Sequence, residues 1–532
     1  MELARAVSAT RPAAGPARRC PQAKPRTAAP QPAGRRPSRA QRLQPVHAAA
    51  TAQAEGLSAW LAAAGVDAAK QAVAPAAAGL VCTRPVKAGE QLFAVPAAAW
   101  ITAETATQSD IGQHLQGLEP WLAVALFLLH ERAKGAASRW APYLAALPAD
   151  SGSPVQWGEE DLKELQGSQA LQTAMAYRAY FQQRYEQLQA ELLQPNAQVF
   201  DPAVFSFDAF LWAACTVRAR SHAPLDGANL ALVPLADMTQ HQRGARSSGW
   251  QVRQVGGLFG AGAAPALVME AAAAMEAGEA VAMDYGPKRT DGQILVDHGA
   301  LDPLVNQASY ALTLELSEEE RNFGDKIDIL ESNGMQQATE FVLRADAAPD
   351  AGLLPLLRLL NLSGVCLLLC LCLLLMLPLM KMLFLPSSKR ALLPLLCLLN
   401  LSGSDCFLLE SIFRNEVWEH MELPVSEDNE RACYQQLIDG CSAALAGYPT
   451  SIDEDLALLN GGSLTPGSRR AAAVRVRLGE KEALDATLRF FEDRIGRLSN
   501  MEYYAERRLK RLGLLDDQGK TTWDGFFEGG IA

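Results

Sequence analysis

The sequence lacks the cysteine patterns that mark zinc sites and disulfide frameworks. Its ten cysteines form no Cys-x-x-Cys pair and no metal-type Cys/His spacing, and four of them crowd residues 366–397. A reducing compartment is therefore predicted. Charged residues are few (20%) and aromatic residues fewer (7%), whereas 49% of the 532 residues are hydrophobic. This composition excludes a wholly disordered chain, and the length predicts two to four domains with a sizeable core.

Acidic residues are almost missing from the first 50 residues, which hold ten Lys or Arg residues and only Glu2. The segment is rich in Ala, Pro and Ser/Thr and has no apolar run of 7–15 residues, so it predicts a chloroplast transit peptide over residues 1–50 and excludes a secretory signal. A basic tail that touches acidic partners is the alternative. The other 482 residues carry a net charge of −20. No nucleic-acid partner is expected, because phosphate binding requires a basic surface.

Apolar periodicity predicts a mixed α/β front half and a helical back half. In the front half, helices are expected at residues 57–70, 120–134 and 168–194, and strands at 91–96, 230–235, 266–270 and 279–284. From about residue 317 onward the pattern is helical. The last long helix carries one apolar stripe, formed by Leu488, Phe491, Ile495, Leu498 and Met501.

An internal duplication interrupts the helical half. Leu353–Gly364 (LLPLLRLLNLSG) recurs as Leu392–Gly403 (LLPLLCLLNLSG), identical at eleven of twelve positions with an offset of 39 residues. Either copy alone would connect smoothly to Ser404, so residues 365–403 are predicted to be an insertion. Residues 359–380 contain no charge and are long enough to cross a bilayer, which leaves a membrane span and a buried Leu-rich helix pair as alternatives. Membrane contact is not expected unless this segment is a true span.

Three blocks could carry chemistry: residues 218–241, 278–286 and 295–300. Asp237 follows a short apolar strand, where a helix N-cap is the plain alternative to a functional carboxylate. His241 and Tyr285, each taken alone, are more often structural residues. The sequence contains no nucleotide-binding loop, nucleophile elbow or His-Glu metal helix, and no metal site is predicted.

Taken in this order, the blocks resemble the SET-domain lysine methyltransferases, and more narrowly the plant Rubisco large-subunit methyltransferase group. The resemblance runs over nearly all of residues 55–520 and includes the stretches SRWAPY (138–143), ESNG (331–334), FRNEVW (413–418) and LPVSEDNE (423–430). It implies an α+β fold. A β-rich SET domain is expected over residues 55–310, with a helical insert at about 150–220. An all-α substrate-binding domain is expected over 311–532, interrupted by the Leu-rich insertion at about 365–403.

The same resemblance implies an S-adenosylmethionine-dependent protein-lysine N-methyltransferase of the chloroplast stroma. Its partner would be a lysine-containing stromal protein, the Rubisco large subunit or an aldolase-like target. Tyr285 matches the catalytic tyrosine of the group. The positions that match cofactor contacts are Ala78, Gly79, Leu80, Arg220, Gln240 and His241. Those that match contacts to the substrate lysine are Arg220, Asp237, Trp250, Tyr285 and His298.

Some of these positions depart from the family pattern. Gln240 stands where the group has Asn, His298 where it has Tyr, and Ala76–Ala78 where it usually has Glu-Gly-Leu. The alternative function is therefore a catalytically degenerate SET protein that acts as a protein-binding module. The ability to bind the cofactor separates the two hypotheses.

Overall fold

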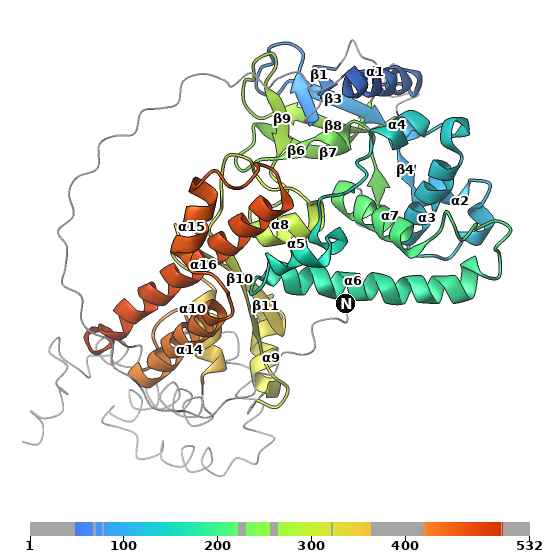
Figure 1. Ribbon diagram of the computed structural model, residues 1–532. Coiled ribbons are helices and arrows are strands. Elements are labelled where there is room, and N and C mark those ends of the chain that lie inside the picture. Colours follow the sequence, from blue (N-terminus) through green and yellow to red (C-terminus); the bar gives the residue numbers. More distant parts are fainter. Residues whose placement is uncertain are drawn as a thin grey trace, which may run out of the picture. The chain divides into compact units, whose positions relative to one another are not determined.

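The computed structural model describes residues 48–66, 71–76, 79–221, 230–255, 264–320, 323–362, 418, 421–501 and 503 (Figure 1). The predicted insertion at 365–403 lies outside these residues, as does the predicted transit peptide up to residue 47. The first described helix, α1 (Ala48–Ala63), begins nine residues before the predicted start at Leu57. The reason is local, because Ala48–Ala54 is rich in alanine, the strongest helix former. None of the helices in the described ranges is both long and apolar enough to span a membrane.

Small sheets form the scaffold of the front half. One has the order β1-β2-β9-β6, from β1 (Val73–Ala76), β2 (Gly79–Cys82), β9 (Ala280–Met283) and β6 (Gln240–His241). A second has the order β3-β8-β7, from β3 (Gln91–Pro96), β8 (Ala264–Ala271) and β7 (Ser247–Val255). A third pairs β4 (Ile101–Thr102) with β5 (Ala231–Leu232). Strands β6 and β9 run parallel, so the chain enters the region after His241 beside the segment that leads to Tyr285.

The predicted strand at 230–235 is shorter in the structure. Pairing stops at Leu232, because Pro234 has no N–H to donate and Leu235 turns the chain with a positive φ of 76°. Its φ and ψ (76°, −56°) are those of a strained γ-turn. A short 3₁₀ turn, Ala236–Met238, follows, and it contains Asp237. The turn at Leu235 ends the strand, so Asp237 lies in the 3₁₀ turn just beyond the strand rather than within it.

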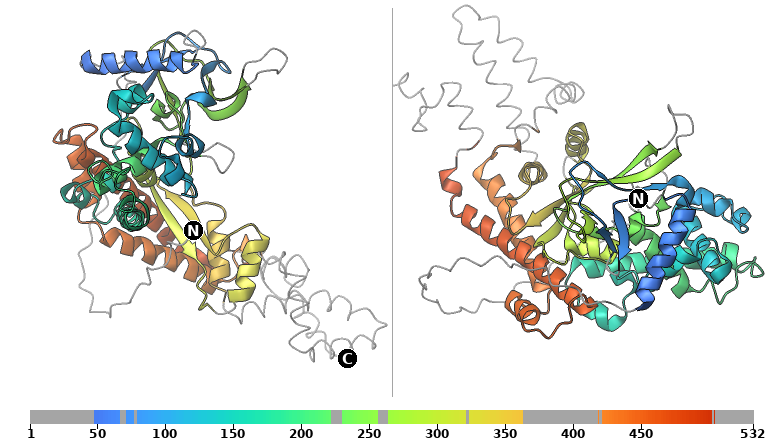
Figure 2. Two further views of the ribbon diagram at one scale, coloured as in Figure 1. Left: turned by 90° about the vertical axis from the view of Figure 1, so that its right-hand side faces the viewer. Right: turned by 90° about the horizontal axis from the view of Figure 1, so that it is seen from above.

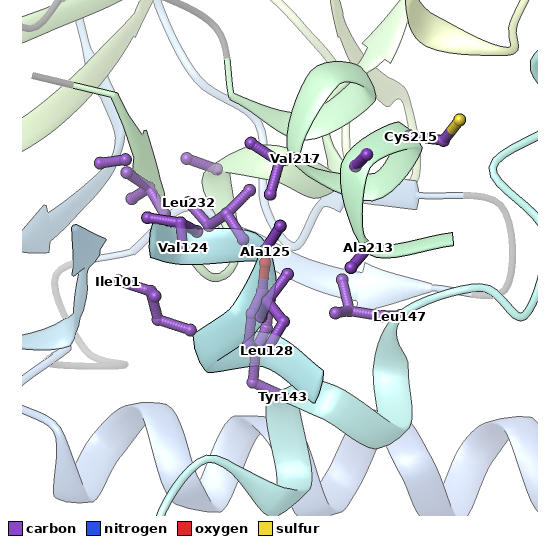
Figure 3. Close-up of a cluster of buried hydrophobic side chains, with 14 of the residues drawn as sticks. Ile101, Val124, Ala125, Leu128, Tyr143, Leu147, Ala213, Cys215, Val217 and Leu232 are labelled. Atoms are coloured by element: carbon purple, nitrogen blue, oxygen red, sulfur yellow. The ribbon is translucent and has the colours of Figure 1, made fainter. Parts of the chain in front are cut away.

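Helices cover the sheets and supply a large share of the first core. They are α2 (Ala103–Thr107), α3 (Pro120–Ala133), α4 (Ala141–Ala146), α5 (Glu159–Lys163), α6 (Gln169–Leu188), α7 (Phe207–Arg220) and α8 (Asp291–His298). Helix α3 starts with Pro120 and is buried nearly all round, as its sequence predicts. Figure 3 shows Val124, Ala125 and Leu128 of α3 in one apolar cluster with Val217 of α7. Tyr143 of α4 lies in the same cluster.

The back half is not entirely helical, which corrects the prediction of an all-α domain. Strands β10 (Ser309–Glu315) and β11 (Ala338–Arg344) form an antiparallel pair, drawn in yellow in Figure 1. In β11, Phe341 and Leu343 are buried with a partly exposed residue between them, as in a half-covered sheet. In β10 this period of two holds only for Ser309 and Ala311, because the next buried residue is Leu314. The other described elements are helices: α9 (Phe323–Ser332), α10 (Leu353–Leu360), α14 (Glu427–Ala446), α15 (Ile452–Asn460) and α16 (Arg469–Ile495).

Helix α16 belongs to both cores. Ala473 and Val476, near its start, pack in the core of the front half, whereas Leu484 and Phe491 pack in a second core with α14 and α10. Figure 2 shows α16 and α14 side by side. The helix ends at Ile495, but Leu498 and Met501 continue the predicted apolar stripe into the same core. The sequence therefore predicted the buried face correctly and the end of the helix wrongly.

A buried carboxyl on α16 should make stability depend on pH. Glu480 accepts a hydrogen bond from Tyr448 Oη at 2.6 Å, and burial raises its pKa to about 7 from the ordinary 4.5. Its favourable contribution is complete below pH 4.5 and is lost as pH rises to about 7, because the unfolded chain ionises first. We expect Glu480→Gln to be more stable than the wild type at pH 8, by about 3 kcal/mol, and equally stable at pH 4.5. Urea unfolding of both proteins at the two pH values tests this, and a pH-independent difference would contradict it.

Candidate active site

A cavity of about 1020 Å³ brings together residues that lie far apart in the sequence. Seven of the predicted site residues line it: Gly79, Arg220, Asp237, Gln240, His241, Tyr285 and His298. Strand β2, the end of α7, the turn after β5, strand β6, the segment after β9 and the end of α8 supply them. Helices α15 and α16 of the back half line the same cavity through Leu459 and Arg475, among others.

Three predicted residues are not found in the cavity wall. Ala78 lies outside the described residues. Leu80 is buried in β2, where it pairs with Val281 of β9 and packs in the first core. Trp250 is also buried in that core, on β7 opposite Met269, and does not line the cavity, so its place beside the substrate lysine stays a prediction.

Asp237 is the centre of a buried polar cluster. Its Oδ2 accepts a hydrogen bond from Tyr143 Oη at 2.7 Å and lies 3.4 Å from Nη1 of Arg220. The same Arg220 nitrogen donates to the Asp237 carbonyl oxygen at 3.2 Å. Burial raises the pKa of Asp237, and the charge of Arg220 and the Tyr143 hydroxyl oppose that rise. Asp237 is therefore not a helix N-cap: its carboxylate contacts the side chains of Tyr143 and Arg220, and the residue before the turn is Leu235.

Tyr143 is a functional neighbour that sequence reasoning did not assign. It occurs in the stretch SRWAPY that supported the family resemblance, yet it lies 94 residues before Asp237. The only signal was therefore membership in a shared motif.

The ring of His241 connects the cavity to the backbone of Tyr285. Its Nδ1 accepts the Tyr285 backbone N–H at 3.2 Å, so a neutral ring carries its proton on Nε2. Burial lowers the pKa of His241, with the charge of Arg243 acting in the same direction. The ring centroids of His241 and Tyr285 lie 5.1 Å apart, and Tyr285 Oη donates to the carbonyl oxygen of Thr239 at 2.6 Å.

The ring of His298 also packs against Tyr285, and the centroids of the two rings lie 4.5 Å apart. Its Nδ1 lies 3.1 Å from the Ala219 carbonyl oxygen, and its Nε2 lies 3.2 Å from Nη1 of Arg289. A carbonyl only accepts and a guanidinium only donates, so the proton is on Nδ1 and Nε2 accepts. Burial lowers the pKa of His298 to about 4. The imidazole of His298 is therefore neutral at physiological pH. A neutral ring does not repel an incoming lysine side chain, as an imidazolium cation would.

The cavity wall has the features expected of a site for a polar ligand. Thr216, Asp237, Thr239 and His241 each present a buried oxygen or nitrogen that has no hydrogen-bond partner in the described parts of the chain. Gly79 adopts a φ of 115°, and a Cβ there would lie 2.9 Å from the Met238 carbonyl oxygen and 2.8 Å from Gln240 Cγ. Only glycine permits this close approach of β2 to the loop. These residues fit S-adenosylmethionine, which has an amino acid head, a ribose and an adenine to be bound.

Comparison with known proteins agrees with this geometry. The family described as "Rubisco LSMT substrate-binding" matches residues 317–365 and 379–484. The chain is 36% identical over 456 residues to the chloroplastic [fructose-bisphosphate aldolase]-lysine N-methyltransferase of Arabidopsis thaliana, which covers 86% of this chain and 85% of the relative. It is 34% identical over 452 residues to the chloroplastic ribulose-1,5 bisphosphate carboxylase/oxygenase large subunit N-methyltransferase of Nicotiana tabacum. This match covers 85% of this chain and 83% of the relative.

Solved structures show the same relationship. The SET domain of LSMT bound to lysine and AdoHcy matches with a TM-score of 0.69 and 33% identity, over 91% of this chain and 99% of that one. Rubisco LSMT bound to AdoMet matches with a TM-score of 0.66 and 32% identity, over 90% and 99%. The predicted α+β fold is confirmed. The chain belongs to the SET-domain protein-lysine methyltransferases of the Rubisco large-subunit methyltransferase family.

Proposed function

We propose that the protein transfers a methyl group from S-adenosylmethionine to the ε-amine of a lysine in a chloroplast stromal protein. The observation that carries the proposal is the convergence of Tyr285, His298 and Asp237 with Gly79 and His241 on one cavity. The relatives named above are chloroplastic enzymes that act on Rubisco large subunit or on aldolase, which supports a target of that class. The alternative of a degenerate binding module has no support from these comparisons.

The reaction requires a neutral amine. A lysine of ordinary pKa, about 10.4, is neutral about once in 2,500 molecules at pH 7, a cost of roughly 4.6 kcal/mol. A poorly solvated cavity lowers the pKa of the amine and removes part of this cost. Two neutral imidazoles and the Tyr285 ring provide such surroundings here, because burial keeps both His241 and His298 uncharged.

Each side chain then has a distinct role. Gly79, Gln240 and His241 would hold the cofactor, which when bound supplies a methyl group on a positively charged sulfur. Tyr285 and His298 would line the approach of the amine, and burial raises the pKa of Tyr285 so that its hydroxyl remains a hydrogen-bond donor. Asp237 Oδ1 would accept a hydrogen bond from the amine, while Arg220 balances the charge of the carboxylate. Catalysis is then mainly positioning and desolvation.

Calorimetric titration with S-adenosylmethionine tests the proposal independently of turnover. We expect binding to the wild type and at least tenfold weaker binding to Gly79→Ala, because the new Cβ overlaps the loop that carries Gln240 and His241. Labelled methyl groups should also enter lysines of proteins in a stromal extract. Absence of binding by the wild type would refute the enzyme. Equal affinities would show that Gly79 and the loop it contacts do not hold the cofactor.

A further inference from the structure

A turn at the mouth of the cavity displays apolar side chains to solvent. Pro303, Leu304 and Val305 are all exposed, and Leu304 has 79% of its surface accessible. Pro303 and Leu304 also line the cavity. An apolar side chain this exposed contributes almost nothing to the core. Residues Asp302–Val305 are called the Leu304 turn below.

Buried polar contacts hold the Leu304 turn in place. Asp302 is fully buried, and its Oδ1 accepts the backbone N–H groups of Leu304 at 2.7 Å and Val305 at 3.1 Å. Its Oδ2 accepts the backbone N–H of Arg243 at 2.6 Å. From α16, Nη2 of Arg475 donates to the carbonyl oxygens of Asp302 at 2.6 Å and Val305 at 2.8 Å. The tip is therefore preorganised, although its side chains lie in solvent.

The back half adds apolar groups to the same mouth. Leu459 lies at the end of α15, and Leu464 and Pro466 lie in the segment before α16. Pro466 is exposed and both leucines are partly exposed. The charged side chains of the cavity wall are already engaged: Asp150 with Arg469, Arg220 with Asp237, and Arg475 with the Leu304 turn. The mouth therefore offers a partner apolar contacts next to charges that are already paired.

We propose that the Leu304 turn and Leu464 form the docking site for an apolar segment of the protein substrate next to the acceptor lysine. This inference rests on the proposed function. A small cofactor inside the cavity would leave a side chain on the rim exposed, whereas a protein that delivers its lysine through the mouth must cover the rim. Fixing the turn beforehand lowers the entropic cost of that contact. Apolar rim residues thus select the neighbours of the lysine, and the cavity acts on the lysine itself.

The test compares Leu304→Ser and Leu464→Ser with the wild type and with Leu456→Ser. Leu456 is a matched control, since it is 36% exposed on α15 but does not line the cavity. Three quantities are measured: the initial rate of labelled methyl transfer into limiting stromal protein, the rate with free lysine, and the KM for S-adenosylmethionine. We expect the rate with protein to fall at least tenfold in both rim variants, as follows from losing the burial of one leucine. The other two quantities, and all three in Leu456→Ser, should not change.

Other outcomes are equally decisive. If both rim variants methylate protein at the wild-type rate, the docking site is refuted. Methylation of free lysine in the same experiment would still support the proposed enzyme activity. A raised KM for the cofactor would assign the rim to the cofactor site instead. If the rim variants keep the wild-type rates but differ from the wild type in how their solution mass depends on protein concentration, the rim is a contact between copies of the chain instead. A wild type that methylates neither protein nor lysine would refute the proposed function itself.

Discussion

Replacing Tyr285 with phenylalanine is expected to lower the rate of methyl transfer by about 10²–10³-fold, roughly 3–4 kcal/mol of activation free energy. The change keeps the ring between His241 and His298 but deletes the hydroxyl that donates to Thr239 at 2.6 Å. In the proposed function, that hydrogen bond would hold the hydroxyl where the amine and the methyl group align. The measurement pairs turnover on a lysine substrate with the free energy of unfolding.

Tyr185→Phe is the matched control for this prediction. Tyr185 Oη also donates to a backbone carbonyl, that of Phe205 at 2.8 Å, but the residue does not line the cavity. Both variants should lose about 1–3 kcal/mol of stability, because each leaves a carbonyl oxygen without its partner. Only Tyr285→Phe should lose activity. Full activity in Tyr285→Phe, with the same loss of stability as the control, would show that Tyr285 is a packing residue.

Two deletions that yield chains of equal length are expected to differ strongly in stability. Removing residues 365–403 keeps the first copy of the repeat, and removing 353–391 keeps the second. The two products differ at one position only, Arg358 against Cys397. Arg358 lies on α10 and forms a buried double contact with Glu430, Nε to Oε2 at 2.7 Å and Nη2 to Oε1 at 2.8 Å. Glu430 is fully buried, so cysteine would leave its charge without a counterion.

We expect the chain with Arg358 to be more stable by about 3–5 kcal/mol, the typical cost of removing one partner of a buried ion pair. Urea unfolding of both proteins gives the difference. Adding Glu430→Gln to the less stable chain should recover part of the loss by removing the buried charge. The deletion of 365–403 should also raise soluble yield relative to the full chain, and the family match is itself interrupted at residues 366–378. Equal stabilities would contradict the role assigned to the Arg358–Glu430 pair. A loss of solubility on deletion of 365–403 would contradict the insertion hypothesis.

Local signals were enough for several elements. The strand at 91–96 and the helix from Pro120 were predicted almost to the residue, because a Gly turn precedes the first and a proline starts the second. The stripe that contains Leu488 and Phe491 was predicted because helical periodicity is written directly in the sequence. The two-stranded sheet of the back half was not, since β10 and β11 pair across an intervening helix and neither strand has a hairpin turn to announce it.

Trp250 shows why a residue's side of a strand escapes sequence reasoning. The register of β7 against β8 shifts between Ser247 and Trp250. A shift of one residue exchanges the two faces of a strand, so the bulge decides whether a side chain reaches the cavity or the core. The local signal is Gly249, which lies within the bulge at a φ of 74°, but a glycine by itself does not say which face Trp250 takes, and Trp250 lies in the core.

By itself, the sequence determined the types of chemical group in the site and the family to which the chain belongs, because these depend on motifs within short segments. Only the tertiary structure decided how the groups act. It joined Tyr143 to Asp237 across 94 residues, fixed the proton of His298 on Nδ1 through the contacts with Ala219 and Arg289, and placed the Leu304 turn at the cavity mouth. Proton positions, burial and pKa depend on neighbours brought from distant segments, and short motifs do not specify those neighbours.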